Sequence, residues 1–194
     1  MSKLIPAIEK RWSPYRFTPQ VVEDEKLVRC LDAARWAASS YNDQPWHFIV
    51  AKREQEVAFN TAVGCLLEAN QGWAKNAGVL MLTVIRTTFQ QNNKPNRVAL
   101  HDLGAAAAHL ALQAAEEGLQ IHQMAGVNLS QVRLAYSIPE GYEPQTAIAI
   151  GYVDTSEAEA GDPLAARDAG DRKRRPLDQF VFAGRWGEGA KLGS

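Results

Sequence analysis

The stretch that decides the fold is ASSYNDQPW, from Ala38 to Trp46, which runs directly into the β-prone segment WHFIVA, from Trp46 to Ala51. Before it, from Val21 to Ala38, apolar residues recur at three- and four-residue spacing, and this pattern predicts an amphipathic helix. Hydroxyl, amide and Pro residues in Ser39 to Pro45 then end that helix. A helix, a polar loop and a buried strand in this order predict a domain that mixes helices with strands.

The apolar pattern continues to alternate along the rest of the chain. Glu54 to Trp73 has helical periodicity, and Gly78 to Ile85 is a nearly continuous apolar run of strand length. Phe89 to Arg97 is polar and contains Pro, which indicates a surface loop or lid. Thr146 to Val153 predicts a third strand. We therefore expect helices placed between a small number of central strands.

The clearest helix is Leu100 to Glu117, which carries Ala and Leu on most of its faces. Gly118 follows it in the position that commonly ends a helix. Because the segment holds so few charges, we expect this helix to be buried nearly all round.

The C-terminal part of the chain has a different composition. Residues 154 to 171 are rich in Ala, Gly and Asp without a core-forming pattern, and a basic run, Arg172 to Arg175, precedes a partly apolar segment, Leu177 to Phe182. An arm that cannot fold alone needs a surface to lie on. We therefore expect a core at residues 1 to 153, with residues 154 to 194 wrapping around a second subunit of a homodimer.

Composition excludes several classes of protein. The 194 residues suffice for one domain, and 21 Lys and Arg against 22 Asp and Glu give a net charge of -1, so neither nucleic acid nor an anionic membrane is expected as a partner. Cys30 and Cys65 are isolated, which favours buried thiols in a reducing compartment. No apolar run has the length of a signal peptide or a membrane span, so a cytoplasmic location is expected.

Four short segments could carry chemistry. In RWSPYRF, Arg11 and Ser13 could bind an anion, although an Arg near an N-terminus is more often a solvated charge. The loop from Ser39 to Gln44 could address a flat heterocycle, or could simply be a turn that satisfies its own backbone. Ala125 and Gly126, in QMAGV, could let the backbone approach a planar ring or could serve packing alone. In the basic run, Arg172 and Arg174 would point to one side of an extended segment and suit a phosphate.

Other common sites are not indicated by the sequence. The histidines at positions 47, 101, 109 and 122 have no metal-like pairing, so structural or surface roles are expected, with His101 and Asp102 forming a capping or pairing arrangement. There is neither a phosphate-binding loop of the GxxxxGK type nor a GxGxxG fingerprint.

Taken in order, the four segments resemble the nitroreductase family of FMN-dependent oxidoreductases, from Ile8 to Trp186. RWSPYRF is similar to the Arg-x-Ser signature of that family, and AASSYNDQPWHFIV is similar to its most recognisable stretch. The resemblance implies an α+β fold with a central, mostly antiparallel sheet flanked by helices, and a C-terminal arm exchanged in a homodimer with FMN sites at the interface. It implies an FMN site formed by Arg11, Trp12, Ser13, Tyr15, Ser39, Ser40, Asn42, Gln44, Asn70, Met124, Ala125, Gly126, Arg172 and Arg174.

The sequence also departs from the pattern of the family. Tyr15 and Trp73 stand about where many members carry basic residues near the flavin, so stabilisation of the reduced flavin is expected to differ, with Arg16 as a candidate replacement. Val127 replaces a common Phe. The short stretch from Thr87 to Asn96 argues against long lid helices.

The function implied by the resemblance is transfer of electrons from NADH or NADPH, through flavin N5, to a small acceptor such as a nitroaromatic or a quinone, by a ping-pong mechanism. No single catalytic side chain is required, because the cofactor supplies the chemistry. A non-catalytic FMN carrier or sensor is the alternative, and an α+β interaction protein that binds no flavin is a third reading.

Overall fold

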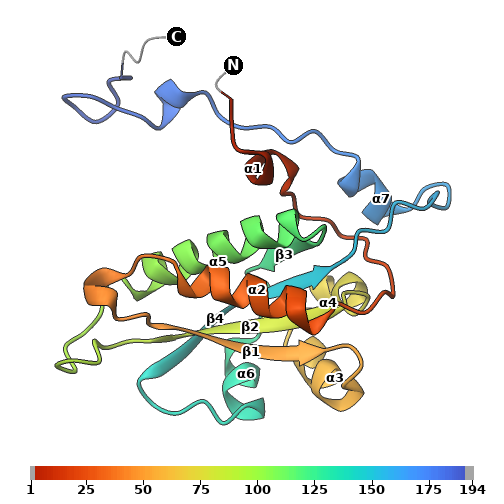
Figure 1. Cartoon of the computed structure of the whole chain (residues 1–194), viewed down its shortest axis with the longest axis horizontal. Coiled ribbons are helices and arrows are strands. Elements are labelled where there is room, and N and C mark those ends of the chain that lie inside the picture. The colour runs from red at the N-terminus through yellow and green to blue at the C-terminus, as the bar shows by residue number, and fades with distance from the viewer. Residues whose placement is uncertain (1–2, 191–194) are drawn as a thin grey trace.

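The computed structural model describes residues 3–190, and their strands form one antiparallel sheet (Figure 1). The strands are β1 (Trp46–Lys52), β2 (Val79–Arg86), β3 (Gln120–Met124) and β4 (Tyr142–Gly151). Their order in the sheet is β1-β2-β4-β3, and each neighbouring pair is antiparallel. The predicted α+β class with an antiparallel central sheet is confirmed.

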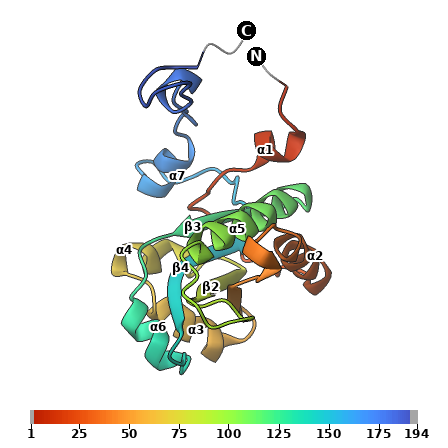
Figure 2. The ribbon, with the colours of Figure 1, turned by 90° about the vertical axis from the view of Figure 1, so that its left-hand side faces the viewer.

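Helices cover both faces of the sheet (Figures 1 and 2). On one face, α2 (Asp24–Arg35) and α5 (Ala99–Glu116) pack on Val79, Met81, Ile148 and Ile150. The other face is covered by α3 (Glu56–Gly64), α4 (Glu68–Ala74) and α6 (Leu129–Ala135), which meet Leu80, Leu82, Ala147 and Ala149. Successive strand residues point to opposite faces, so the continuous apolar runs of β2 and β4 supply both cores at once.

The strand and helix expectations hold with two corrections. The predicted helix Glu54 to Trp73 is two helices, α3 and α4, because residues 65–67 leave the helical path, where Leu66 forms an isolated bridge with Val127. The sequence reading did not identify β3 or α6, both of which are short and lack a long apolar period. β3 lies at the edge beside β4 and supplies the segment that carries Met124.

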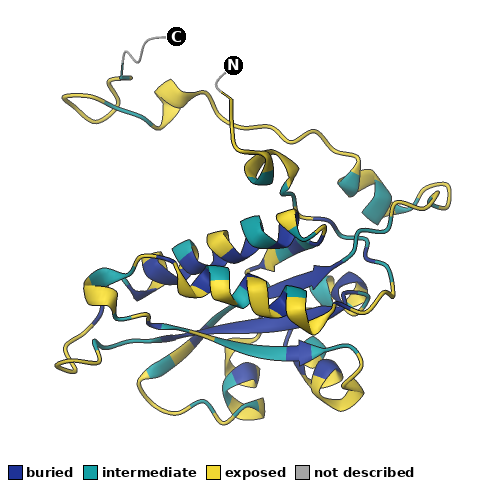
Figure 3. Ribbon diagram, viewed as in Figure 1, coloured by how far each residue is buried: buried dark blue, intermediate teal, exposed yellow. Residues whose placement is uncertain are grey.

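The long helix α5 is not buried nearly all round, contrary to expectation. Its inner residues lie in the core, but Leu100 is 57% exposed and Gly104 and Ala108 are also on the surface (Figure 3). One side of the helix packs on the sheet, and the outer side combines small apolar residues with the exposed polar residues His101, His109 and Glu116. Gly118 follows the helix with φ of 77°, as expected for a residue that ends it.

The arm runs away from the sheet beside the N-terminal segment, at the top of Figure 1. It is not wholly extended, since it contains the short helix α7 (Pro163–Asp168) and the 3-10 turn η2 (Leu177–Gln179). The N-terminal segment contains α1 (Pro6–Lys10), which packs near α5. The last four residues of the predicted arm lie outside the described residues.

Two further expectations can be compared with the described residues. Cys30 and Cys65 are free and buried, and burial raises the pKa of the Cys30 thiol to about 11. No helix within residues 3–190 is both long and apolar enough to cross a bilayer.

Candidate functional site

Three arginines meet where the arm passes the N-terminal segment. The pKa of the Arg11 guanidinium is lowered mainly by burial and also by the positive charges of Arg172 and Arg174. The side chains of Arg172 and Arg174 therefore lie close enough to repel the charge of Arg11. None of the three takes part in an ion pair within residues 3–190. A group of like charges without a carboxylate partner is suited to binding an anion.

Main-chain contacts hold this cationic cluster in place. The Arg172 guanidinium donates to the carbonyl oxygens of Glu9, at 2.7 Å, and Arg11, at 2.8 Å. The backbone amide of Trp12 donates to Oε1 of Gln120 on β3, at 3.0 Å. Ser13 is exposed beside these contacts. The arm and the N-terminal segment are therefore joined at the cluster, and the segment is joined to the sheet.

An aromatic cluster lies between this region and α4. The Tyr15 ring is 5.1 Å from that of Trp73 and 4.6 Å from that of His122, and the Trp73 and His122 rings are also 4.6 Å apart. Nδ1 of His122 is 2.9 Å from the carbonyl oxygen of Pro14, and burial lowers the pKa of the His122 imidazole. The sequence reading treated His122 as structural, and no local pattern connects it with Tyr15.

Arg16, the candidate replacement for a basic residue near the flavin, contacts acidic residues of the arm. Its Nη2 lies 3.0 Å from Oδ2 of Asp154, and its Nε lies 3.7 Å from Oδ2 of Asp162, so its charge is already paired with the beginning of the arm. The Asp168 carboxylate accepts from the backbone amides of Tyr15, at 2.8 Å, and Arg16, at 3.1 Å. These contacts fix the first part of the arm, including α7, against the N-terminal segment.

Asn70 and Gly126 are in close contact just after the end of β3. The Asn70 side chain donates to the Gly126 carbonyl oxygen at 3.1 Å, and the backbone amide of Leu67 donates to the same oxygen at 3.0 Å. A Cβ at Gly126 would lie 2.4 Å from Nδ2 of Asn70, so any larger residue here would displace the Asn70 side chain. Ala125 is exposed, whereas Met124 points into the core and can offer only its backbone to a ligand.

The loop before β1 has an unusual backbone. Tyr41, Asn42 and Gln44 have φ values of 55°, 55° and 48°, in the left-handed region that residues other than Gly rarely adopt. The Gln44 backbone amide donates to Oγ of Ser39 at 3.0 Å, and its side chain donates to Asn42. Such strain persists only where the surroundings determine the conformation, and it is common at ligand-binding loops.

Two buried carboxylates hold this loop in place, and the sequence reading identified neither as a loop support. Both carboxylate oxygens of Asp43 accept from Nη2 of Arg86 at 2.9 Å, and Oδ1 also accepts from the backbone amide of Gln90 at 2.8 Å. Asp102, in the first turn of α5, accepts from the Ser40 backbone amide at 3.0 Å. Each partner is at least 43 positions away along the chain, so no local motif could indicate these contacts.

The candidate residues thus fall into two groups that one chain keeps apart. The cationic cluster, Tyr15, Asn70 and Gly126 gather around β3, whereas the loop Ser39–Gln44 precedes β1. β1 and β3 are the opposite edges of the sheet, and three strand spacings separate these edges by roughly 14 Å. No hydrogen bond within the described residues joins the two groups.

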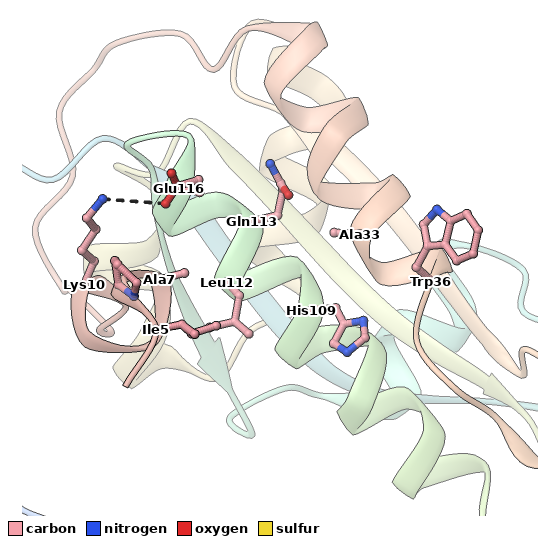
Figure 4. Close-up of a pocket in the computed structure, with 10 residues that line it drawn as sticks. Ile5, Ala7, Lys10, Ala33, Trp36, His109, Leu112, Gln113 and Glu116 are labelled. Carbon is pink, nitrogen blue, oxygen red and sulfur yellow. Dashed lines mark ion pairs between the residues drawn. The ribbon is translucent and has the colours of Figure 1, made fainter. Parts of the chain in front are cut away.

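The hollow shown in Figure 4 lies elsewhere, between α1, α2 and α5. It has a volume of about 550 Å³ and is lined by Ile5, Pro6, Ala7, Lys10, Ala33, Trp36, His109, Leu112, Gln113 and Glu116. None of the residues predicted for the site lines it. No metal-binding group of His, Cys, Asp or Glu is found among residues 3–190.

The chain is similar to several known proteins in sequence and in fold. The Nitroreductase family model matches residues 8–152. A crystal structure described as an oxidoreductase containing FMN is 36% identical, with a TM-score of 0.87 and coverage of 95% of this chain and 93% of the other. An uncharacterised 15.4 kDa protein in the ask 5′ region of Mycolicibacterium smegmatis is 33% identical over 72% of this chain and 97% of its own length.

A nitroreductase family protein from Clostridium difficile 630 shares the fold, with a TM-score of 0.71 at 24% identity and coverage of 95% and 99% of the two chains. A Methanothermobacter thermautotrophicus relative, named as a candidate NADH dehydrogenase or NAD(P)H nitroreductase, is 23% identical over 77% of this chain and 76% of its own length.

Proposed function

Because the chain belongs to the nitroreductase family, we propose that it is an FMN-dependent oxidoreductase that passes electrons from NADH or NADPH to a small acceptor. The observation that carries this proposal is the presence of both a cationic cluster and the Asn70 amide group held against Gly126. The FMN-containing relative with 36% identity supports the choice of cofactor. The name of the archaeal relative supports a nicotinamide donor.

The residues present fit FMN. Arg11, Arg172 and Arg174 have unpaired charge to offer a phosphate, with the Ser13 hydroxyl beside them. The absence of a Cβ at Gly126 lets the Asn70 side chain pack against the Gly126 backbone, which holds the Asn70 amide group in place to address a flat heterocycle. Trp12, Tyr15, Met124 and Ala125 complete this half of the proposed site.

When bound, FMN would supply two-electron chemistry at N5, alternately accepting from the nicotinamide and giving to the acceptor. The protein binds and orients the cofactor and needs no nucleophile, which agrees with Cys30 and Cys65 being buried. Because donor and acceptor would use one open face in turn, we expect ping-pong kinetics. Nitroaromatics and quinones are the proposed acceptors.

We propose that the second half of the site, formed by Ser39, Ser40, Asn42 and Gln44, comes from another copy of the chain. The separation of the two groups at opposite edges of the sheet supports a contribution from a second chain. The loop also exposes the aromatic ring of Tyr41, and the arm exposes Phe180 and Trp186, as expected for surfaces that a partner covers. A cytoplasmic homodimer with two interfacial sites is the resulting proposal.

The experiment that tests this function compares FMN with riboflavin, which lacks the phosphate. In Arg174→Gln, FMN affinity should fall by roughly 10- to 100-fold, since a charged hydrogen bond contributes about 1.5–3 kcal/mol. Riboflavin affinity should stay unchanged. Arg175→Gln is the matched control, because Arg175 lies over the Phe180 ring and outside the cluster.

An anaerobic absorbance spectrum then separates the alternatives. Flavin bands that bleach on adding NADH or NADPH support the oxidoreductase. Bands that persist with both nucleotides favour an FMN carrier or sensor. A protein that binds no FMN would contradict both and leave the interaction protein, with its basic arm, as the remaining reading.

A further inference from the structure

His101 and Asp102 form a dyad beside the strained loop. Nδ1 of His101 lies 3.1 Å from Oδ1 of Asp102, while Oδ2 of Asp102 accepts from the Ser40 backbone amide at 3.0 Å. One carboxylate therefore connects an imidazole to the loop. The other exposed histidine of the same helix, His109, has no such partner among the described residues (Figure 4).

Burial differs sharply across the dyad. The Asp102 side chain is 3% exposed, whereas the His101 side chain is 82% exposed. A carboxylate oxygen only accepts hydrogen bonds, so Nδ1 of His101 carries a proton and Nε2 is the nitrogen presented outward. The buried carboxylate thus orients an imidazole that is open to solvent and fixes its tautomer, as carboxylates do for histidines that exchange protons.

The position of the dyad relates it to the proposed site. Ser40 is hydrogen-bonded to Asp102 and belongs to the loop that we propose contributes to the flavin site of the other subunit. Leu100, next to His101, is an exposed apolar residue of the same region. If the loop meets the flavin of the partner, the outward-facing Nε2 of His101 reaches the same space.

We propose that His101 is a catalytic residue that one subunit contributes to the flavin site of the other, where it donates a proton to the reduced acceptor. This inference rests on the proposed function. For a quinone, the reduced cofactor would supply two electrons and one proton, and Nε2 of the His101 imidazolium gives the second proton. A hydroquinone results, and solvent reprotonates Nε2. Asp102 is a positioning residue for both His101 and Ser40.

The first test uses two acceptors that differ in their need for a proton. FMN-loaded protein is reduced anaerobically and mixed with benzoquinone or with ferricyanide, which accepts electrons alone. In His101→Gln, reoxidation by benzoquinone should slow by roughly 10²-fold. Reoxidation by ferricyanide should change by less than about 2-fold. His109→Gln is the matched control and should behave as the unmodified protein with both acceptors.

The second test does not depend on turnover. Imidazole NMR signals are assigned with the two Gln variants, and the FMN-loaded protein is recorded oxidised and after reduction with dithionite. The His101 signals should shift on reduction, because charge is added next to the ring, while those of His109 stay in place.

The outcomes distinguish this inference from the proposed function. If the unmodified protein binds FMN and nicotinamide bleaches it, but His101→Gln slows both acceptors equally or neither, the proton-donor role is wrong. Signals of His101 that do not move on reduction overturn its placement at the flavin. Failure to bind FMN at all would instead reject the proposed function on which the inference rests.

Discussion

At the scale of single residues, Gly126 shows how a main-chain position can control a site. Its carbonyl oxygen accepts hydrogen bonds from the Asn70 side chain and the Leu67 backbone amide. Because Gly126 has no Cβ, Nδ2 of Asn70 can occupy the space where a Cβ would lie. Since Nδ2 is the far end of a side chain, it can move aside. The cost of an added methyl group is therefore expected in ligand binding more than in folding.

Gly126→Ala is predicted to weaken FMN binding by at least about 10-fold while lowering the free energy of unfolding by only about 1 kcal/mol, the contribution of one hydrogen bond. Fluorescence titration with FMN and chemical unfolding measure the two effects. Gly72→Ala is the control, because Gly72 lies in the same helix as Asn70 with nothing near its would-be Cβ. It should leave FMN binding unchanged. A Gly126→Ala protein with normal affinity would show that FMN binding does not depend on the placement of Asn70 against Gly126.

At the scale of elements, a charged contact joins the two helices that cover one face of the sheet. Arg29 of α2 donates from Nε and Nη2 to the two carboxylate oxygens of Glu117, just after α5, at 2.7 Å each. Gln113 adds a bond to the same carboxylate at 2.8 Å. The Arg29 hydrogen bond is the main cause that lowers the pKa of Glu117 to about 2.

This pair predicts a pH dependence of stability. A carboxyl group whose pKa is lower in the folded state stabilises the fold above its unfolded pKa of about 4.3, and this contribution is lost as pH falls towards 2. Stability should therefore drop between pH 5 and pH 2 by more in the unmodified protein than in Arg29→Gln. Urea unfolding across this range measures the difference. Parallel curves for the two proteins would show that the pair contributes little, as exposed ion pairs often do.

The helices α3 and α4 show why element boundaries need tertiary contacts. Apolar residues continue at helical spacing from Glu54 to Trp73, so the sequence favours one helix. In the fold, the residues between α3 and α4 pair with the segment after β3, where the backbone amide of Asn128 donates to the carbonyl oxygen of Cys65 at 2.8 Å. That pairing places Asn70 beside Gly126. The end of β3, which is distant in sequence, therefore determines both the break between α3 and α4 and the position of Asn70.

At the scale of the whole molecule, the proposed division of the site between two subunits makes a sharp prediction. Arg11→Gln damages the cationic half, and Asp43→Ala removes the carboxylate that holds the loop half. Each variant alone should bind FMN poorly. A mixed dimer, however, would contain one site with both halves intact and one with neither.

Co-expression of the two variants should therefore restore FMN binding to about a quarter of all sites, because half of randomly formed dimers are mixed and each has one intact site. Bound FMN per subunit, measured from the absorbance of the purified mixture, is the readout. Two preparations mixed after separate purification, without exchange of subunits, serve as the control. No recovery in co-expressed protein would indicate that each site is built from a single chain.

The sequence by itself determined the α+β class, the central strands, the long helix and the existence of a separate arm, because apolar periodicity and turn residues are local properties of the chain. It also pointed to the Arg11, Ser39–Gln44 and Gly126 segments. Only the tertiary structure determined which residues hold these three segments in place. Asp43, Asp102 and His122 act on partners far away in sequence, and the two sheet edges separate segments that the sequence alone could not place.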